Sequence, residues 1–224
     1  MKKLFFLVFF CALSSAEVKW SDVNECVLPD NSIFINNIIN KMTLEQKVGQ
    51  IIMPEINNIT PQDAKKYHFG TILNGGGGFP NQSKNSKIND WKKLSESYYD
   101  ASTEVDGIRI PILWGTDAVH GHNNVIGATI FPHNIGLGAT RNIELIESIG
   151  QAVAKEVVST GIIWTFAPTI AVPRNDTWGR TYEGFSENTD LVSELGQSFI
   201  EGLQGEDKEF LDEYHVPVSY THLT

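Results

Sequence analysis

The chain has 224 residues, a net charge of −10 at neutral pH, and a composition that is 41% hydrophobic and 20% charged. These proportions are those of a globular protein, and they exclude a disordered chain or a long coiled coil. The length suits one large domain or two small ones. Because the charge is acidic, we expect neither nucleic acid nor an anionic membrane surface as a partner.

The first sixteen residues have the pattern of a secretory signal peptide. Lys2 and Lys3 precede an apolar run at residues 4–13, and residues 14–16 (Ser-Ser-Ala) supply the small side chains of a cleavage site. The run is too short to span a bilayer, which needs about 20 apolar residues. We therefore expect residues 1–16 to be removed, and the protein to be secreted, periplasmic or cell-wall associated without membrane contact.

The two cysteines of the chain are Cys11 and Cys26. Only Cys26 remains after the expected cleavage, which excludes an intrachain disulfide and zinc sites built on cysteine. Residues 17–40 form a lead segment, and residues 41–224 are assigned to one domain.

Short apolar runs alternate with helical spacing from the start of this domain. Thr43-Leu44-Glu45-Gln46 predicts a capping box that begins a helix, and residues 48–54 predict a first buried strand. Residues 69–74 predict a second strand that ends at four glycines, residues 75–78. A helix is predicted over residues 91–105.

The second half of the chain continues this alternation. Asn142 and Gly161 flank its clearest amphipathic helix, as an N-cap and a C-terminal stop. The predicted elements are strands at 110–115 and 162–167 and helices at 142–160 and 187–204.

Strands that alternate with helices predict an α/β fold with a parallel sheet. A doubly wound sheet and a (β/α)8 barrel both fit the pattern. Polar residues directly follow the strands, namely Asn74, Asp117 and the segment 174–188, and both folds bind ligands at the carboxyl ends of their strands. No G-x-G-x-x-G opens a helix, so glycines 75–78 predict a close backbone turn and not a dinucleotide site.

The connection over residues 168–186 is long for a strand-to-helix loop, which is typical of a functional segment. Its side chains can stack on a sugar ring or bind vicinal hydroxyls through planar groups. An internal salt-bridge lattice that pins the loop is the alternative for each of them apart from Arg180. These residues are Arg174, Trp178, Arg180, Tyr182 and Glu183.

Two long stretches, LWGTDAVHGHNNVIGATIFPHNIGLGATRN (113–142) and FAPTIAVPRNDTWGRTYEGFSEN (166–188), follow TILNGGGG (71–78) and MTLEQKVGQ (42–50). In this order they strongly resemble glycoside hydrolase family 3, of the exo-acting β-glucosidase or β-glucan glucohydrolase type. The resemblance covers roughly residues 41–205. It implies the first part of a (β/α)8 TIM-like barrel, left incomplete in this chain.

The resemblance also implies an activity, which is hydrolysis of terminal non-reducing β-D-glucosyl residues by a retaining mechanism without a cofactor or metal. Asp117 of G-T-D-A-V-H-G and Arg180 of W-G-R would then bind the hydroxyls of the terminal glucosyl unit of a β-glucoside or β-glucan. A pocket that encloses the chain end accounts for exo action. Neither residue would cleave the bond.

A retaining enzyme needs two carboxyl groups about 5 to 5.5 Å apart, and the resemblance assigns neither to this chain. In the family the nucleophile is an Asp of a later strand and the acid/base is a Glu of a second domain, so we assign no catalytic residue. Residues 216–224 do not match the family motif that we expect there. We therefore expect a truncated product that lacks the second domain and is inactive on its own.

Three rival functions fit part of the sequence. A metal-dependent barrel hydrolase would use His120 and His122, an H-x-H pair with His133 nearby, although these residues lie beyond the expected strand end. An N-acetylhexosaminidase of the same family typically has a D-x-E-G-G-like motif where this chain has G-T-D-A-V-H-G. A non-catalytic sugar-binding domain fits Asp117 and Arg180.

Overall fold

A computed structural model describes residues 31–103 and 108–205 of the chain. The expected signal peptide and the tail at 216–224 lie outside the described residues. The chain divides into two units, residues 1–37 and 38–224. Helix α1 (Ser32–Lys41) begins in the first unit and ends in the second. In the described ranges, no helix is both long enough and apolar enough to cross a bilayer.

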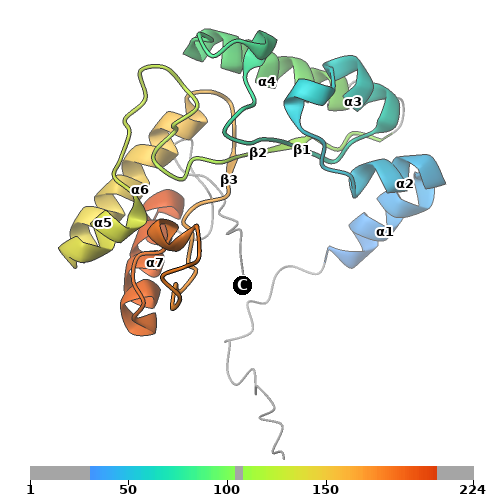
Figure 1. Cartoon of the computed structure of the whole chain (residues 1–224). Coiled ribbons are helices and arrows are strands. Elements are labelled where there is room, and N and C mark those ends of the chain that lie inside the picture. Colours follow the sequence, from blue (N-terminus) through green and yellow to red (C-terminus); the bar gives the residue numbers. More distant parts are fainter. Residues whose placement is uncertain (1–30, 104–107, 206–224) are drawn as a thin grey trace, which may run out of the picture. The chain divides into compact units, whose positions relative to one another are not determined.

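The centre of the second unit is a three-stranded parallel sheet with the strand order β1-β2-β3 (Figure 1). Parallel strands that neighbour each other in chain order are the arrangement at the start of a (β/α)8 barrel. The predicted fold class, an α/β fold that forms the first part of a barrel and is incomplete, is confirmed. The strands are β1 (Thr71–Asn74), β2 (Leu113–Thr116) and β3 (Trp164–Thr165).

Helices connect and flank these strands, and their ends follow the capping residues of the sequence. The Thr43–Gln46 capping box is present, and the side chains of Asn142 and Asn188 accept the N–H groups of Leu145 and Leu191. The helices of this unit are α2 (Leu44–Gln50), α3 (Pro61–Tyr67), α4 (Ile88–Thr103), α5 (Asn134–Thr140), α6 (Ile143–Val158) and α7 (Thr189–Gln204).

The strand predicted over residues 48–54 is wrong, because the helix begun by the capping box continues through Gln50. The following residues run beside β1 but make only an isolated bridge between Glu55 and Leu73, with the Leu73 N–H donating to the Pro54 carbonyl. At Gly49 a Cβ would lie 2.0 Å from the Tyr67 carbonyl oxygen, so α2 and the end of α3 are in backbone contact.

An aromatic cluster packs α4 against the sheet. The Trp91, Tyr98 and Trp114 side chains are buried, and the Tyr98 and Trp114 rings meet edge to face at 5.7 Å. The Tyr98 hydroxyl donates to the Ile59 carbonyl at 3.1 Å, so its polar end is satisfied inside the core.

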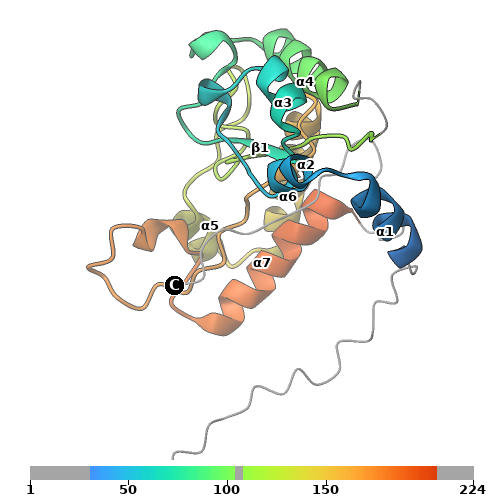
Figure 2. The same ribbon diagram turned by 90° about the vertical axis from the view of Figure 1, so that its right-hand side faces the viewer.

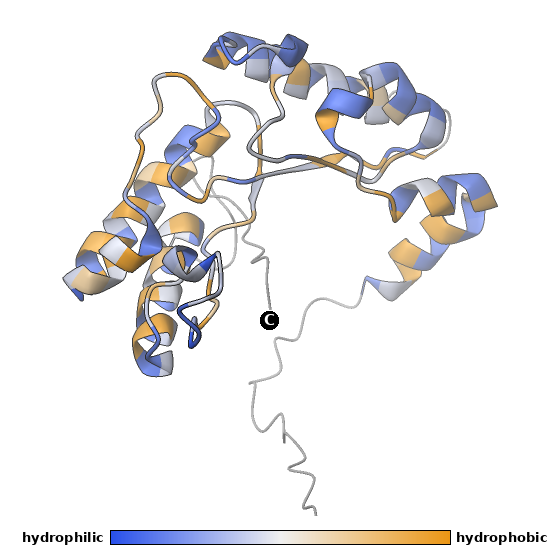
Figure 3. Ribbon diagram, viewed as in Figure 1, coloured by the Kyte–Doolittle hydropathy of each residue, from blue (hydrophilic) through white to orange (hydrophobic). Residues whose placement is uncertain are grey.

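Helices α6 and α7 lie side by side, as both ribbon views show (Figures 1 and 2). A Cβ at Gly150 would lie 2.5 Å from the Phe199 carbonyl oxygen, and one at Gly202 would lie 2.2 Å from the Glu147 carbonyl oxygen. Both helices are amphipathic (Figure 3), and their apolar sides are buried. The two glycines therefore allow backbone contact between the helices.

Candidate functional site

The carboxyl ends of the three strands bring the sequence-predicted residues to one edge of the sheet. Asn74 pairs with Thr116, which in turn pairs with Thr165, and all three are buried. The next residue after β2 is Asp117, whose backbone N–H donates to the Asn74 carbonyl at 3.3 Å. The ladder therefore fixes the backbone from which the Asp117 side chain extends.

Asn74 is a structural residue of this edge. Its Oδ1 accepts the indole N–H of Trp114 at 2.8 Å, and its side chain is fully buried. Because buried polar groups need partners, this pair fixes the ends of β1 and β2 against each other.

The predicted glycine turn after β1 is present and lies beside Asp117. The Gly78 N–H donates to the Gly75 carbonyl at 3.1 Å, which closes the turn. A Cβ at Gly78 would lie 2.1 Å from Glu55 Oε1, whereas Gly76 and Gly77 face open space. A Cβ at Gly75 would lie 3.5 Å from Asp117 Oδ2, so this carboxylate lies over the turn.

Arg180 is held by Glu183 from the same loop after β3. Its Nε and Nη2 donate to Glu183 Oε1 and Oε2, both at 2.6 Å, in a bidentate ion pair. This hydrogen bonding raises the pKa of the Arg180 guanidinium against the opposing effect of burial, and the charges of Glu183, Tyr182 and Asp117 raise it further. Asp117 and Arg180, which come from the loops after β2 and β3, are therefore within electrostatic range of each other.

Other residues of this loop fix its course. Arg174 donates to the Thr189 hydroxyl at 3.1 Å, which ties the loop to the start of α7. The Thr181 hydroxyl donates to the Trp178 carbonyl at 2.8 Å. The Arg180–Glu183 ion pair is a contact of the kind that an internal salt-bridge lattice would contain, whereas the Arg174 contact with Thr189 is a hydrogen bond to a hydroxyl.

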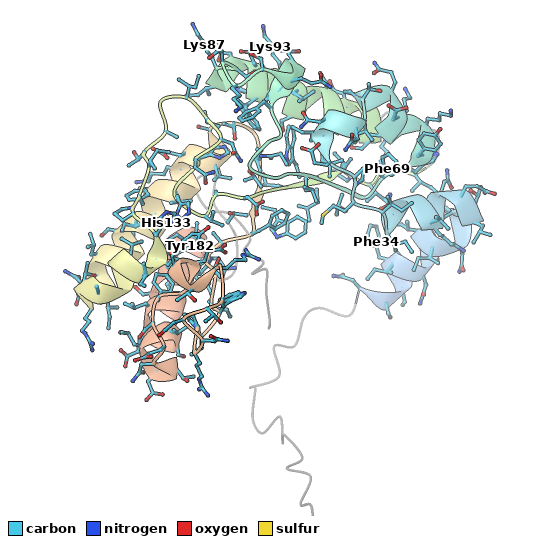
Figure 4. The ribbon with its side chains drawn as sticks, in the orientation of Figure 1. Phe34, Phe69, Lys87, Lys93, His133 and Tyr182 are labelled. Atoms are coloured by element: carbon cyan, nitrogen blue, oxygen red, sulfur yellow. The ribbon has the colours of Figure 1, made fainter. Side chains whose placement is uncertain are left out.

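His133 and Tyr182 lie side by side (Figure 4), and the His120 ring meets the His133 ring edge to face at 4.3 Å. His133 Nδ1 and His120 Nε2 lie 3.0 Å apart, and the His133 and Tyr182 rings meet edge to face at 4.7 Å. Burial lowers the pKa of His120, and His133 lowers it further, while Glu183 partly opposes this. One ring nitrogen of the histidine pair must accept, so the two rings cannot both be protonated while this bond exists.

His122 lies in a different environment from His120. It is fully buried, its Nε2 lies 3.0 Å from the Thr160 hydroxyl, and its ring contacts Trp91. Burial lowers its pKa to about 4. The two histidines of the H-x-H pair thus have separate partners, and over residues 31–103 and 108–205 no group of three His, Cys, Asp or Glu side chains is placed to hold a metal ion.

Helix α5 and its contacts with the loop were not predicted from the sequence. Asn134, the first residue of this helix, is buried and donates from Nδ2 to the Glu183 carbonyl at 2.8 Å. The sequence gives only a weak signal for this helix, because His133 at the N-cap makes no side-chain capping bond. Gly136 and Gly138, which are poor helix formers, weaken the signal further.

The family of the chain follows from its sequence profile. The profile described as "Glycosyl hydrolase family 3 N terminal domain" matches residues 43–223. The chain belongs to glycosyl hydrolase family 3. Among curated relatives, the lysosomal beta glucosidase of Dictyostelium discoideum is 32% identical over 191 residues, which are 79% of this chain and 23% of the relative.

The periplasmic beta-glucosidase of Salmonella typhimurium is 28% identical over 194 residues, which are 84% of this chain and 23% of that protein. The chain thus spans about a quarter of the length of these curated relatives.

The predicted division of the chain into a signal peptide at 1–16, a lead segment at 17–40 and a barrel domain at 41–224 with an unmatched tail at 216–224 stays a prediction.

Solved structures agree with this family membership. The exo-1,3/1,4-beta-glucanase of a Pseudoalteromonas species is 48% identical, with a TM-score of 0.81 over 87% of this chain and 25% of that one. The beta-N-acetylhexosaminidase of Beutenbergia cavernae, at 20% identity and a TM-score of 0.64, shares the fold.

Proposed function

We propose that this chain forms the glucosyl-binding part of an exo-acting β-glucosidase or β-glucanase, in which Asp117 and Arg180 bind the terminal non-reducing sugar. The observation that supports this most directly is that both side chains extend from the segments after neighbouring strands at the carboxyl edge of the sheet, where the charge of Asp117 acts on Arg180. A carboxylate accepts and a guanidinium donates, so together they match vicinal hydroxyls.

The relatives support a glucosidase over the other functions. The curated relatives carry the names lysosomal and periplasmic beta-glucosidase, and the exo-1,3/1,4-beta-glucanase is the more similar solved structure at 48% identity. The lower identity of the beta-N-acetylhexosaminidase supports only a shared fold. Bond cleavage in this proposal belongs to two carboxyl groups that we place outside this chain, in a retaining mechanism.

The compartment is part of the same proposal. The relatives named periplasmic and lysosomal act outside the cytosol by name, and residues 1–16 have the pattern of a signal peptide. We place the protein in a secreted or periplasmic compartment. Detection of a mature N-terminus at Glu17 by mass spectrometry would support this, and an intact Met1 on exported or cytosolic protein would contradict it.

Kinetics of site variants in the complete gene product test the sugar-binding roles. We expect Asp117→Asn and Arg180→Gln each to lower kcat/KM for a p-nitrophenyl β-glucoside roughly 10- to 100-fold, because a hydrogen bond to a charged group contributes about 1.5 to 3 kcal/mol. Steady-state kinetics over a range of substrate concentrations measures this loss.

Asp176→Asn and Arg109→Gln are matched controls. They remove one charge of each sign from exposed positions, and we expect them to change kcat/KM less than threefold. If the Asp117 and Arg180 variants behave like these controls while remaining folded, the sugar-binding assignment is wrong.

A further inference from the structure

We propose that Glu183 is a positioning residue for Arg180, and that it determines which edge of the guanidinium faces the sugar. This inference rests on the sugar-binding role proposed for Arg180 above. It adds a third residue, which does not itself contact substrate, to the pair of Asp117 and Arg180.

The hydrogen bonds of Arg180 define the edge that remains for a ligand. The guanidinium has five N–H donors in a planar fork, and Glu183 takes one on Nε and one on Nη2. Three N–H groups are left, two on Nη1 and one on Nη2. The Nη1/Nη2 edge can therefore donate two roughly parallel hydrogen bonds, which suits adjacent hydroxyls of one sugar ring.

Glu183 can impose this orientation because it is itself fixed. Its backbone N–H donates to the Arg180 carbonyl at 2.9 Å, within the short helix η3 (Thr181–Glu183). Its carbonyl accepts from Asn134 Nδ2 at 2.8 Å, and Asn134 is buried at the start of α5. The Glu183 side chain is 18% exposed and the Arg180 side chain is 42% exposed, so the carboxylate is the better anchored partner.

Stabilisation of the fold is a poor explanation for this ion pair. An ion pair on a partly exposed side chain contributes little to folding, because solvent screens it and two long side chains lose freedom. The bidentate geometry instead restricts Arg180 to one rotamer, with its guanidinium within the electrostatic reach of Asp117. It also cancels the charge of Arg180, which suits a neutral sugar better than an anionic one.

A double-mutant cycle in the complete gene product separates positioning from a structural role. We expect Glu183→Ala and Glu183→Gln to raise KM for a p-nitrophenyl β-glucoside about tenfold, with kcat changing less than threefold. If Glu183 acts through Arg180, then Glu183→Ala adds less than twofold to KM in an Arg180→Ala background. Glu183→Asp, which keeps the charge, is expected to recover part of the affinity.

The control is Glu187→Gln, which removes an exposed carboxylate from the end of the same loop and should leave KM unchanged. Thermal unfolding of each variant identifies those that fail to fold. If Glu183→Ala does not fold, Glu183→Gln, which is closer in shape to the wild-type side chain, takes its place in the cycle.

The possible failures are distinguishable. An Arg180→Ala variant with unchanged KM contradicts the sugar-binding role and this inference together. If Arg180→Ala raises KM but the Glu183 changes have no effect, or act with full size in the Arg180→Ala background, only the positioning role is wrong.

Discussion

At the scale of single residues, His122 shows how burial controls the response of this domain to pH. Its ring is enclosed beside Trp91 and Thr160, and its pKa falls to about 4. The unfolded chain has a histidine pKa near 6.5, so between these two values the unfolded state binds a proton that the folded state does not. The contribution of His122 to the free energy of unfolding is therefore fully present above about pH 6.5 and is lost as the pH falls towards 4.

We expect this residue to account for a loss of roughly 3 kcal/mol of unfolding free energy between pH 7 and pH 4, from 1.36 kcal/mol per pKa unit. His122→Gln should lower the stability at pH 7, since it loses the ring contact with Trp91, but should flatten the pH dependence. Unfolding at pH 7 and pH 4.5 measures both effects. His68→Asn is the control, because Asn tolerates the left-handed conformation of that residue. Equal pH dependence in the wild type and His122→Gln would contradict the prediction.

The role of a single residue could be predicted where it depended on its neighbours in the sequence, and could not where it depended on contacts with distant residues. Asp117 and Arg180 lie in stretches that resemble the family and directly follow predicted strands, so they could be named in advance. The role of Asn134 could not, because its contact with the Glu183 carbonyl joins residues 49 positions apart. His120 and His122 look alike in sequence, and only the packing of Trp91 and His133 around them separates their environments.

At the scale of elements, strong amphipathic patterns were predictable and elements held by backbone contact were not. Helices α6 and α7 agree with their predicted ranges to within a few residues, because their apolar spacing and Asn caps act together. Helix α5 contains two glycines in seven residues, so its propensity is low and tertiary contacts determine it. The predicted strand at 48–54 was wrong because an apolar run alone does not distinguish a strand from a helix.

Helix α5 also offers a matched pair of glycine substitutions. A Cβ at Gly138 would lie 1.8 Å from the Phe185 carbonyl oxygen, whereas the nearest atom to a Cβ at Gly136 is 3.8 Å away. We expect Gly138→Ala to destabilise the protein by about 3 kcal/mol through overpacking against backbone. Gly136→Ala should be neutral or stabilise it by about 0.5 to 1 kcal/mol, because Ala favours the helix.

Thermal or chemical unfolding of both variants measures this difference. Because α5 also holds the Glu183 carbonyl, Gly138→Ala should raise KM for a β-glucoside as well. A Gly138→Ala protein as stable as Gly136→Ala would show that the contact between α5 and Phe185 is not formed as described.

At the scale of the whole molecule, the described sheet has an unprotected side. Strand β3 pairs with β2 on one edge, and in residues 31–103 and 108–205 no strand pairs with its other edge. Beside α7, a groove of about 520 Å³ is lined by Ile170, Val172, Val192 and Ile200 among others. An unpaired strand edge and an apolar groove each favour association between chains.

We therefore expect the 224-residue chain, purified by itself, to form oligomers or aggregates and to show no turnover of a p-nitrophenyl β-glucoside. Size-exclusion chromatography with light scattering measures the first outcome, and an absorbance assay measures the second. A monodisperse monomer would contradict the expected association. Turnover above that of a chain carrying Asp117→Asn would contradict the expected inactivity.

The in-register row of Asn74, Thr116 and Thr165 has a consequence for how substrate preference can change. The row is held by main-chain hydrogen bonds and by buried side chains, whereas Asp117 and Arg180 extend from segments attached to it. The segment 166–188 lies between two regular elements, β3 and α7, and can therefore be exchanged as a unit. Grafting it from a relative with another sugar preference, together with its α5 contacts, should transfer that preference without redesign of the strands beneath.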